Sequence, residues 1–251
     1  MNPASSQRPL LESHDVRLSL PDAELEGSLT LPKRAPGLVL FAHGSGSSRH
    51  SPRNRYVAEI LQDAGLGTLL MDLLTRDEDA VDQYTRQYRF DIGLLANRLT
   101  GAVDWLERLP EAGELPIGLF GASTGAAAAL QAAAARPDRV QAVVSRGGRP
   151  DLAGEALEHV QAPTLLIVGA ADTPVIPLND EALRRLQAHA EMRLVPGASH
   201  LFEEPGTLAA ASALARDWFV RHLAPEANSA SPGTVGFRVG AQLDDRRSRS
   251  G

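Results

Sequence analysis

A short stretch in the middle of the chain, residues 115–126, constrains the fold more than any other. Its sequence, LPIGLFGASTGA, begins as an apolar run typical of a buried strand and continues directly into an alanine-rich helix. Between the two lies G-A-S-T-G, a G-x-S-x-G pattern that places a serine on a tight turn at a helix N-terminus. Gly121 and Gly125 leave room for the strand and the helix to cross closely. We therefore predict that Ser123 is a nucleophile; the alternative is an ordinary glycine-rich turn with a buried serine.

The segments on either side of this turn alternate between strand and helix patterns. Two segments with alternating apolar residues, 16–20 and 24–31, predict an antiparallel strand pair at a sheet edge. Continuous apolar runs predict buried strands at 37–42, 67–73, 140–145 and 164–168, in addition to the one that begins at residue 115, with a last strand at 192–195. Helices are expected at 52–64, 91–109, 179–190 and 207–223, and residues 75–89 are expected to form an exposed polar excursion. This order predicts an α/β fold with a mainly parallel central sheet, helices on both faces and an N-terminal antiparallel pair.

The length of 251 residues fits one large α/β domain, which we place at residues 13–224. Residues 1–12 are expected to be a disordered lead. Residues 225–251 are rich in Asn, Ser, Pro, Gly and Arg and are expected to be a disordered tail, because they cannot bury enough apolar surface to fold alone.

Composition excludes several classes of function. A net charge of −6 argues against nucleic acid or an acidic membrane surface as the main partner. The chain has no cysteine, so it can form neither a thiol nucleophile nor a thiolate metal site. The N-terminus lacks the apolar core of a signal peptide, and no segment reaches the roughly 18 apolar residues of a membrane span. We therefore expect a cytoplasmic protein that does not bind membranes.

A serine nucleophile needs a base and a carboxylate that orients the base. In this kind of sheet the partners follow the serine in the order acid, then histidine, in loops after strands. Of the seven histidines, His200 alone lies in a Gly-rich loop after the last strand. Asp172 lies a few residues past a buried strand and is the predicted acid, with Asp151 as the reserve candidate.

An oxyanion hole needs two backbone N–H groups that point at the developing charge. We expect them from Thr124, directly after the nucleophile, and from Ser45, in the loop H-G-S-G after an earlier strand. His43 is expected to brace that loop. Arg49 and Arg146 are candidate substrate contacts, although such arginines more often pair with surface carboxylates. Three other arginines are candidates for the pocket mouth, Arg53, Arg55 and Arg149.

With G-A-S-T-G, the His43-Gly44 pair, Asp172 and His200 in place, residues 15–223 resemble the α/β-hydrolase superfamily, and more narrowly its dienelactone-hydrolase-like branch. The stretches SRGGRPDL and PGASHLF resemble a bacterial subgroup of such hydrolases, some of which are fused to phosphoribosyltransferase-like domains; no such domain is expected in this chain. The resemblance implies hydrolysis of small esters or lactones with no cofactor. Dienelactone hydrolases proper use a cysteine nucleophile, so the resemblance favours a serine carboxylesterase here.

Three alternatives remain open at this point. The stretch G-S-G-S-S-R after a strand approaches a dinucleotide-binding fingerprint, with Asp72 ending the next strand, but Arg49 stands where close packing requires a third glycine. The same predicted triad could carry out acyl transfer or peptide hydrolysis, since the acceptor depends on pocket shape. A non-catalytic scaffold with an unused triad is the third. The expected partner is a small-molecule ester, no metal is expected, and the sequence makes no prediction of oligomeric state.

Overall fold

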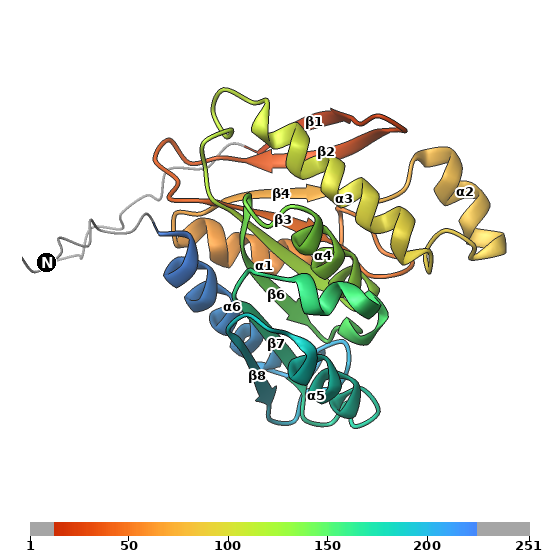
Figure 1. Cartoon of the computed structure of the whole chain (residues 1–251), viewed down its shortest axis with the longest axis vertical. Helices are drawn as coiled ribbons and strands as arrows, with labels where there is room; N and C mark the ends of the chain where they lie inside the picture. Colours follow the sequence, from red (N-terminus) through yellow and green to blue (C-terminus); the bar gives the residue numbers. More distant parts are fainter. Residues whose placement is uncertain (1–12, 225–251) are drawn as a thin grey trace, which may run out of the picture.

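The computed structural model describes residues 13–224; the predicted lead and tail lie outside the described residues. Eight strands form one sheet in the order β1-β2-β4-β3-β5-β6-β7-β8 (Figure 1). The strands are β1 (Ser13–Ser19), β2 (Glu24–Thr30), β3 (Leu38–Ala42), β4 (Gly67–Met71), β5 (Ile117–Ala122), β6 (Val140–Arg146), β7 (Thr164–Gly169) and β8 (Ala190–Val195). β2 pairs antiparallel with β1 and with β4, and the strands from β4 to β8 run parallel. The predicted fold class is confirmed.

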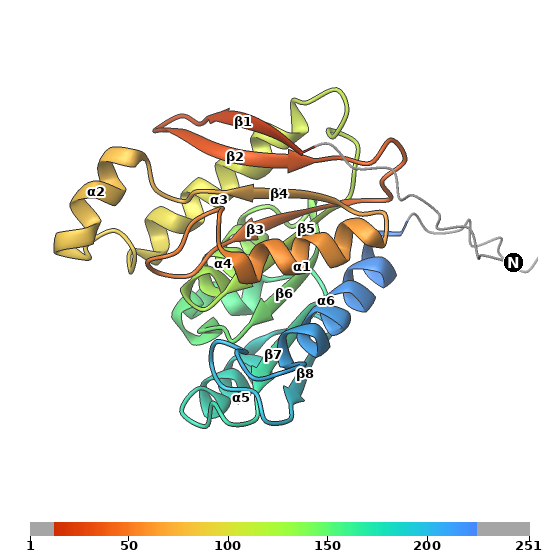
Figure 2. The same cartoon turned by 180° about the vertical axis from the view of Figure 1, so that it is seen from behind.

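Helices cover both faces of the sheet. They are α1 (Pro52–Asp63), α2 (Arg76–Thr85), α3 (Ile92–Glu107), α4 (Thr124–Ala135), the 3-10 helix η1 (Pro150–His159), α5 (Ile176–Arg185) and α6 (Thr207–Leu223). α1 and α6 lie on one face, and α3, α4 and α5 lie on the other (Figures 1 and 2). Within residues 13–224, no helix combines the length and the apolar character needed to cross a membrane.

The continuous apolar runs of the central strands are explained by two separate hydrophobic cores. Successive side chains of a strand point to opposite faces of the sheet. In β3, Leu38 and Leu40 enter the core under α3 and α4, whereas Val39 and Phe41 enter the core under α1 and α6. Phe41 also packs against Phe120 of the neighbouring strand, with ring centroids 4.9 Å apart. The parallel strands are therefore packed on both faces, which explains why their sequences are continuously apolar.

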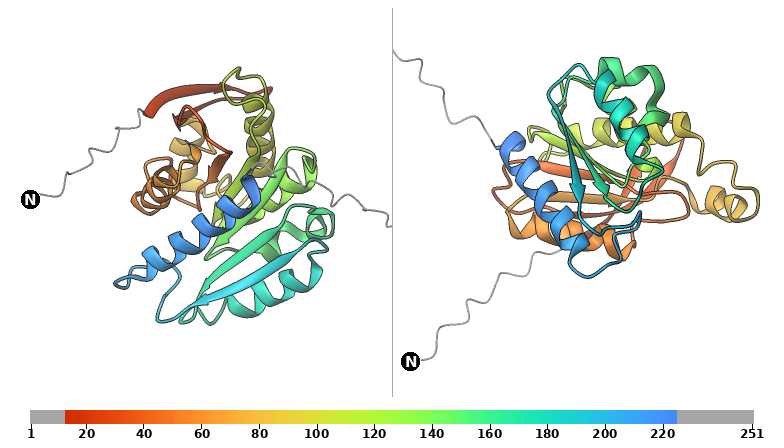
Figure 3. Two further views of the ribbon diagram at one scale, coloured as in Figure 1. Left: turned by 90° about the vertical axis from the view of Figure 1, so that its left-hand side faces the viewer. Right: turned by 90° about the horizontal axis from the view of Figure 1, so that it is seen from below.

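Three parts of the fold differ from the sequence-based prediction. The polar excursion 75–89 contains the helix α2, which stands away from the sheet in Figures 1 and 3. The helix predicted at 179–190 corresponds to α5. It begins three residues earlier than predicted, has a proline in its first turn and ends before β8. The helix η1 was not predicted; Gly154 interrupts it with a left-handed backbone.

Candidate active site

The turn between β5 and α4 holds Ser123 in a strained conformation. Its φ of 52° and ψ of −122° lie in a region that residues other than glycine rarely adopt. The Ser123 amide donates to the carbonyl oxygen of Arg146 at 3.3 Å, and the Ser123 carbonyl accepts from the amides of Ala126 and Arg149, each at 3.1 Å. The loop that follows β6 therefore holds this turn in place, and strain maintained by neighbouring structure is typical of functional sites.

The two glycines of the turn are required by close backbone contacts. A Cβ atom on Gly121 would lie 2.4 Å from the Cα of Ala126, and one on Gly125 would lie 2.3 Å from the carbonyl oxygen of Ala42. Neither position can carry a side chain without moving the backbone. The strand and the helix cross as closely as the sequence predicted.

Asp172 and His200 meet across the ends of two neighbouring strands. Asp172 follows β7, His200 follows β8, and His200 Nδ1 lies 2.7 Å from Asp172 Oδ2. A carboxylate only accepts hydrogen bonds, so Nδ1 carries the proton and Nε2 is left with a lone pair. Asp172 is buried, and 37% of the His200 side chain is exposed. Gly169 permits this approach, because a Cβ there would lie 2.3 Å from the carbonyl oxygen of Ala198 in the histidine loop.

Ser123 and His200 line one cavity of about 270 Å³. Among residues 13–224, no hydrogen bond joins the Ser123 hydroxyl to the His200 ring. A nucleophile and its base are often further apart than hydrogen-bond length before substrate binds. The arrangement therefore provides a hydroxyl and an imidazole in the lining of one cavity and a buried carboxylate behind the imidazole.

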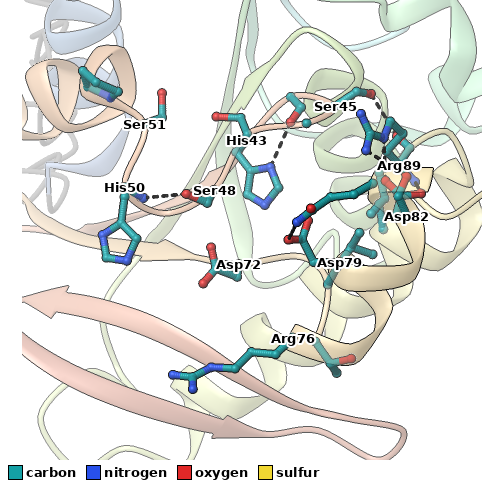
Figure 4. A pocket seen from close by; sticks show the side chains of 18 residues that line it. His43, Ser45, Ser48, His50, Ser51, Asp72, Arg76, Asp79, Asp82 and Arg89 are labelled. Carbon is teal, nitrogen blue, oxygen red and sulfur yellow. Dashed lines mark hydrogen bonds and ion pairs between the residues drawn. The ribbon is translucent and has the colours of Figure 1, made fainter. Parts of the chain in front are cut away.

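Ser45 lines this cavity and is hydrogen-bonded to the buried Thr124. The Ser45 amide donates to Thr124 Oγ1 at 3.0 Å, and the two hydroxyl oxygens are 2.8 Å apart. The Ser45 hydroxyl in turn donates to the carbonyl oxygen of Arg89 at 2.9 Å (Figure 4). Gly44 brings the loop close to Ser123, since a Cβ on Gly44 would lie 3.1 Å from the Ser123 Cβ. The two predicted oxyanion donors are thus neighbours, and the Ser45 amide is bonded to the Thr124 side chain.

A second cavity of about 720 Å³ lies on the other side of the same loop (Figure 4). Gly44, Ser45, Ser47 and Ser51 line both cavities. The second cavity is bordered by α2 and includes the side chains of three aspartates and two arginines, namely Asp72, Asp79, Asp82, Arg76 and Arg89. The loop after β3 therefore separates the cavity of Ser123 from the cavity under α2.

His43 braces this loop in one tautomer. Its Nδ1–H donates to the carbonyl oxygen of Gly44 at 2.9 Å, and its Nε2 accepts from the amide of Leu73 at 3.1 Å. Burial lowers the pKa of His43, and the Gly44 hydrogen bond and the charges of Asp72 and Asp79 oppose this only in part. A neutral imidazole satisfies both contacts, which is the bracing role predicted for His43.

Arg49 is paired with carboxylates, the role that the sequence analysis gave as the more common one for such arginines. Its guanidinium forms ion pairs with Asp72 and, at 2.8 Å, with Glu26, and its backbone amide donates to Asp72. Among the described residues, those that line the cavity of Ser123 include Arg146 but not Arg49. Arg49 therefore joins the loop to β2 and to the end of β4, and its contact with substrate stays a prediction.

A model of the dienelactone hydrolase family matches residues 25–223. The chain belongs to this family. A crystal structure of dienelactone hydrolase from Anabaena variabilis is 60% identical, with a TM-score of 0.83, over 84% of this chain and 98% of that one. An esterase from Pyrococcus furiosus shares the fold at 19% identity, with a TM-score of 0.70, over 85% of this chain and 94% of that one.

Two curated relatives from strains of Mycobacterium tuberculosis are 54% identical to this chain over 215 residues. Both carry the provisional name phosphoribosyl transferase. The matched region covers 86% of this chain and 48% of each relative, so the chain spans about half the length of the curated relatives it matches. The proteins that carry this name are about twice as long as the region that they share with this chain.

Family membership and strand order argue against the dinucleotide-binding alternative. Counted from β3, the strand before the G-S-G-S-S-R stretch, the parallel strands follow the order 2-1-3-4-5-6, whereas the dinucleotide fold has the order 3-2-1-4-5-6. Asp72, the residue that would contact a ribose, is instead the partner of Arg49. Among residues 13–224, no group of three His, Asp or Glu side chains could hold a metal ion.

Two parts of this hydrolase-family site were not singled out by the sequence analysis. Gly147 has a φ of 51°, and a Cβ there would lie 2.9 Å from the carbonyl oxygen of His200, so this glycine admits the histidine loop. Glu204 accepts from the amide of Ser199 at 3.0 Å and closes that loop. The glycine pair in SRGGRP was a visible signal for the first; the second depends on a contact within a loop and carries no pattern of its own.

Proposed function

We propose that this protein is a serine hydrolase that cleaves small, short-acyl carboxylic esters or lactones through an acyl-enzyme on Ser123. The observation that carries the proposal is the Asp172–His200 hydrogen bond, which leaves His200 Nε2 free in the cavity that Ser123 also lines. Membership of the dienelactone hydrolase family supports ester-bond hydrolysis as the reaction class.

In this mechanism His200 takes the proton of the Ser123 hydroxyl through Nε2 as the oxygen attacks the ester carbonyl. Asp172 holds the ring in the required tautomer and stabilises the imidazolium that forms. His200 then gives the proton to the leaving alkoxide, and an alcohol departs. Water repeats the cycle on the acyl-enzyme and releases the carboxylic acid, so the enzyme returns to its starting state.

The oxyanion would be held by backbone amides on two sides. Thr124 begins α4, so its amide is among the N–H groups of a helix N-terminus that have no partner within the helix. Ser45 would supply the other amide after releasing Thr124 Oγ1. Donors of this kind are worth about 3 kcal/mol each in related chemistry, because they act where water is excluded.

The size of the cavity supports a small substrate. A volume of about 270 Å³ is at the lower end of ligand pockets. The helix α2 has only ten residues and borders the neighbouring cavity. The segment that contains it is too short to form a large lid over the site. Both features favour accessible esters of short acids over long-chain lipids.

The decisive experiment compares the wild type with Ser123→Ala on p-nitrophenyl esters from acetyl to dodecanoyl. We expect activity that is highest on short chains and that falls at least about 10⁴-fold in the variant, since the nucleophile is lost. Ser28→Ala, a serine on β2 far along the sheet, is the matched control. Hydrolysis that survives in Ser123→Ala would contradict the assignment. Acyl transfer to added alcohols and cleavage of amides, measured in parallel, test the two alternative uses of the triad.

A further inference from the structure

Residues 146–149 form the β6 loop, which ends β6 and leads to η1. This loop carries none of the three predicted catalytic residues, but it contacts two of them. Its first carbonyl oxygen and its last amide are both bonded to the backbone of Ser123. Gly147 lies against the histidine loop, because a Cβ on it would be 2.9 Å from the carbonyl oxygen of His200. The position of the β6 loop therefore determines where the nucleophile lies relative to the histidine.

Asn179 links the β6 loop to the loop of the predicted acid. It lies near the start of α5 and is 0% exposed. Its Nδ2 donates to the carbonyl oxygen of Gly148 at 3.2 Å and to that of Val175 at 2.9 Å. The amide of Val175 in turn donates to the carbonyl oxygen of Asp172 at 3.2 Å. In the described part of the chain, no other side-chain hydrogen bond joins the β6 loop to α5 or to the loop before α5.

The surroundings of Asn179 fix which end of its amide donates. Two carbonyl oxygens face Nδ2, and an amide turned the other way would place Oδ1 against both of them. Both N–H groups are therefore in use, and the planar amide holds the two loops at a fixed angle. Oδ1 is buried and has no partner among the described residues. An unpaired buried oxygen costs free energy that a leucine of similar size would avoid, so filling the core does not account for this side chain.

We propose that Asn179 is a positioning residue that holds the turn of the nucleophile at the correct distance from the acid–histidine pair. The proposal rests on the function proposed above. Asn179 lines neither the cavity of the nucleophile nor the cavity under α2, so it acts through the β6 loop. That loop is tightly packed at Gly148, where a Cβ would lie 2.6 Å from the Cβ of Ala126. A displacement of about 1 Å in a reacting group can lower a rate about 10²-fold without changing the contacts to substrate.

The first test separates the two hydrogen bonds of Asn179. Asn179→Ser keeps a hydroxyl that can donate to the carbonyl of Val175, four residues earlier, but is too short to reach Gly148. Asn179→Leu removes both donors. We expect kcat on p-nitrophenyl acetate, counted per active site titrated with a fluorophosphonate, to fall about 10- to 100-fold in both variants. KM should stay within about twofold of the wild type, because no substrate contact is lost. The pH profile of kcat/KM should keep its shape, because the acid–histidine bond is untouched.

Gln131→Leu is the matched control. The side-chain amide of Gln131 also donates to a carbonyl oxygen, that of Ala153 in η1 at 3.4 Å, but it does not reach the β6 loop. We expect wild-type kcat and KM in this variant. A lower melting temperature with wild-type kcat per active site in the Asn179 variants would show a structural role only and overturn the proposal. A raised KM with unchanged kcat would also overturn it. If Asn179→Leu does not fold, Asn179→Ser decides the outcome alone.

Hydrogen exchange separates failure of this inference from failure of the proposed function. Loss of the bond to Gly148 should speed exchange over residues 146–150 about 3- to 10-fold in Asn179→Ser, relative to the wild type and to Gln131→Leu. This result does not depend on ester cleavage. If exchange is faster there and the wild type cleaves no ester, the link between the loops is supported and only the proposed reaction fails. Equal exchange rates would overturn the inference.

Discussion

Two carboxylates follow strands on the C-terminal side of Ser123, and they have different partners. Asp151 receives both donors of the Arg149 side chain, at 2.8 and 2.9 Å. Asp172 receives His200. The chain-order rule favoured Asp172, and the pairing of Asp151 with its near neighbour gives a structural reason for the difference. Asp151, the reserve candidate, is thus already paired with a positive charge.

This difference predicts the effect of removing each charge. Asp172→Asn should lower kcat/KM on a short ester by about 10³- to 10⁴-fold, because an amide no longer holds Nδ1 as the donor. Asp151→Asn removes the same charge from the adjacent loop and should change kcat/KM by less than about threefold. Steady-state kinetics of the two variants beside the wild type check this. Equal losses would show that Asp172 acts through folding and not through His200.

The lowered pKa of His43 predicts that the stability of the protein depends on pH. Because burial lowers the pKa of His43 in the folded chain, the unfolded chain takes up a proton first as the pH falls below the ordinary value of 6.5. The free energy of unfolding should therefore decrease by about 1 kcal/mol between pH 7 and pH 5.5 from this group. Urea unfolding should show a smaller decrease for His43→Gln. His14→Gln, at an exposed histidine, should behave like the wild type. If His43→Gln loses as much free energy of unfolding between pH 7 and pH 5.5 as the wild type does, another group causes the effect.

Local sequence patterns identify candidate residues by their own turns but do not identify distant partners. Ser123, Asp172 and His200 were singled out because each follows a strand, and their catalytic roles stay predictions. For Arg49 the sequence left two roles open, and the structure pairs it with Glu26 of β2 and with Asp72, which follows β4. Spacing along the chain gives no indication of which carboxylate a long, flexible side chain will meet.

At the scale of elements, α2 was missed because its residues are polar and the segment has no apolar stripe. The signal for its start was present, since Thr75 and Glu78 form a capping box. Its end is fixed by Asp82, which is 1% exposed and accepts from the amides of Tyr88 and Arg89 and from the Arg89 side chain. A buried aspartate in a polar segment could be recognised only with these partners in view.

The contacts of Asp82 predict how firmly α2 is attached to the segment that follows it. Burial alone would raise the pKa of Asp82, but the bonds from Arg89 and Tyr88 outweigh it and lower the pKa, so the carboxylate is charged and holds Arg89 in place. Asp82→Asn should destabilise this segment by about 3 kcal/mol, as expected when one partner of a buried ion pair is removed. Hydrogen exchange should accelerate over residues 76–91, while the exposed Asp77→Asn should exchange like the wild type. Unchanged protection in Asp82→Asn would contradict the attachment.

At the scale of the whole molecule, alternating strands and helices were enough to predict the sheet, its antiparallel edge and its two covered faces. What could not be predicted was how closely α6 approaches the sheet. Gly118 lies in the middle of β5, where a Cβ would be 2.6 Å from a ring carbon of Phe219 in α6. A glycine inside a strand indicates such an approach but does not name the neighbour.

Gly118→Ala should therefore destabilise the entire domain, since β5 is central and both cores pack on it. We expect a loss of about 1–3 kcal/mol from overpacking. The melting temperature should fall by about 2–4 °C for each kcal/mol. Gly93→Ala, on the exposed start of α3 where the nearest atom to a new Cβ is 3.5 Å away, is the matched control. Calorimetry that finds no difference between the two would contradict the close packing of α6 on β5.

The hydrogen bond from the Ser45 amide to the Thr124 hydroxyl gives this protein an internal competitor for its own proposed oxyanion hole. Tethered next to the amide, the hydroxyl competes at a high effective concentration, and an ester oxygen must displace it to be bound. Ground-state binding is weakened by that exchange. The negative oxyanion, a much stronger acceptor than a neutral hydroxyl, wins it readily. In the proposed oxyanion hole, releasing the Thr124 hydroxyl would cost the same free energy for either acceptor, so a neutral ester would be bound weakly while the charged oxyanion would still be held.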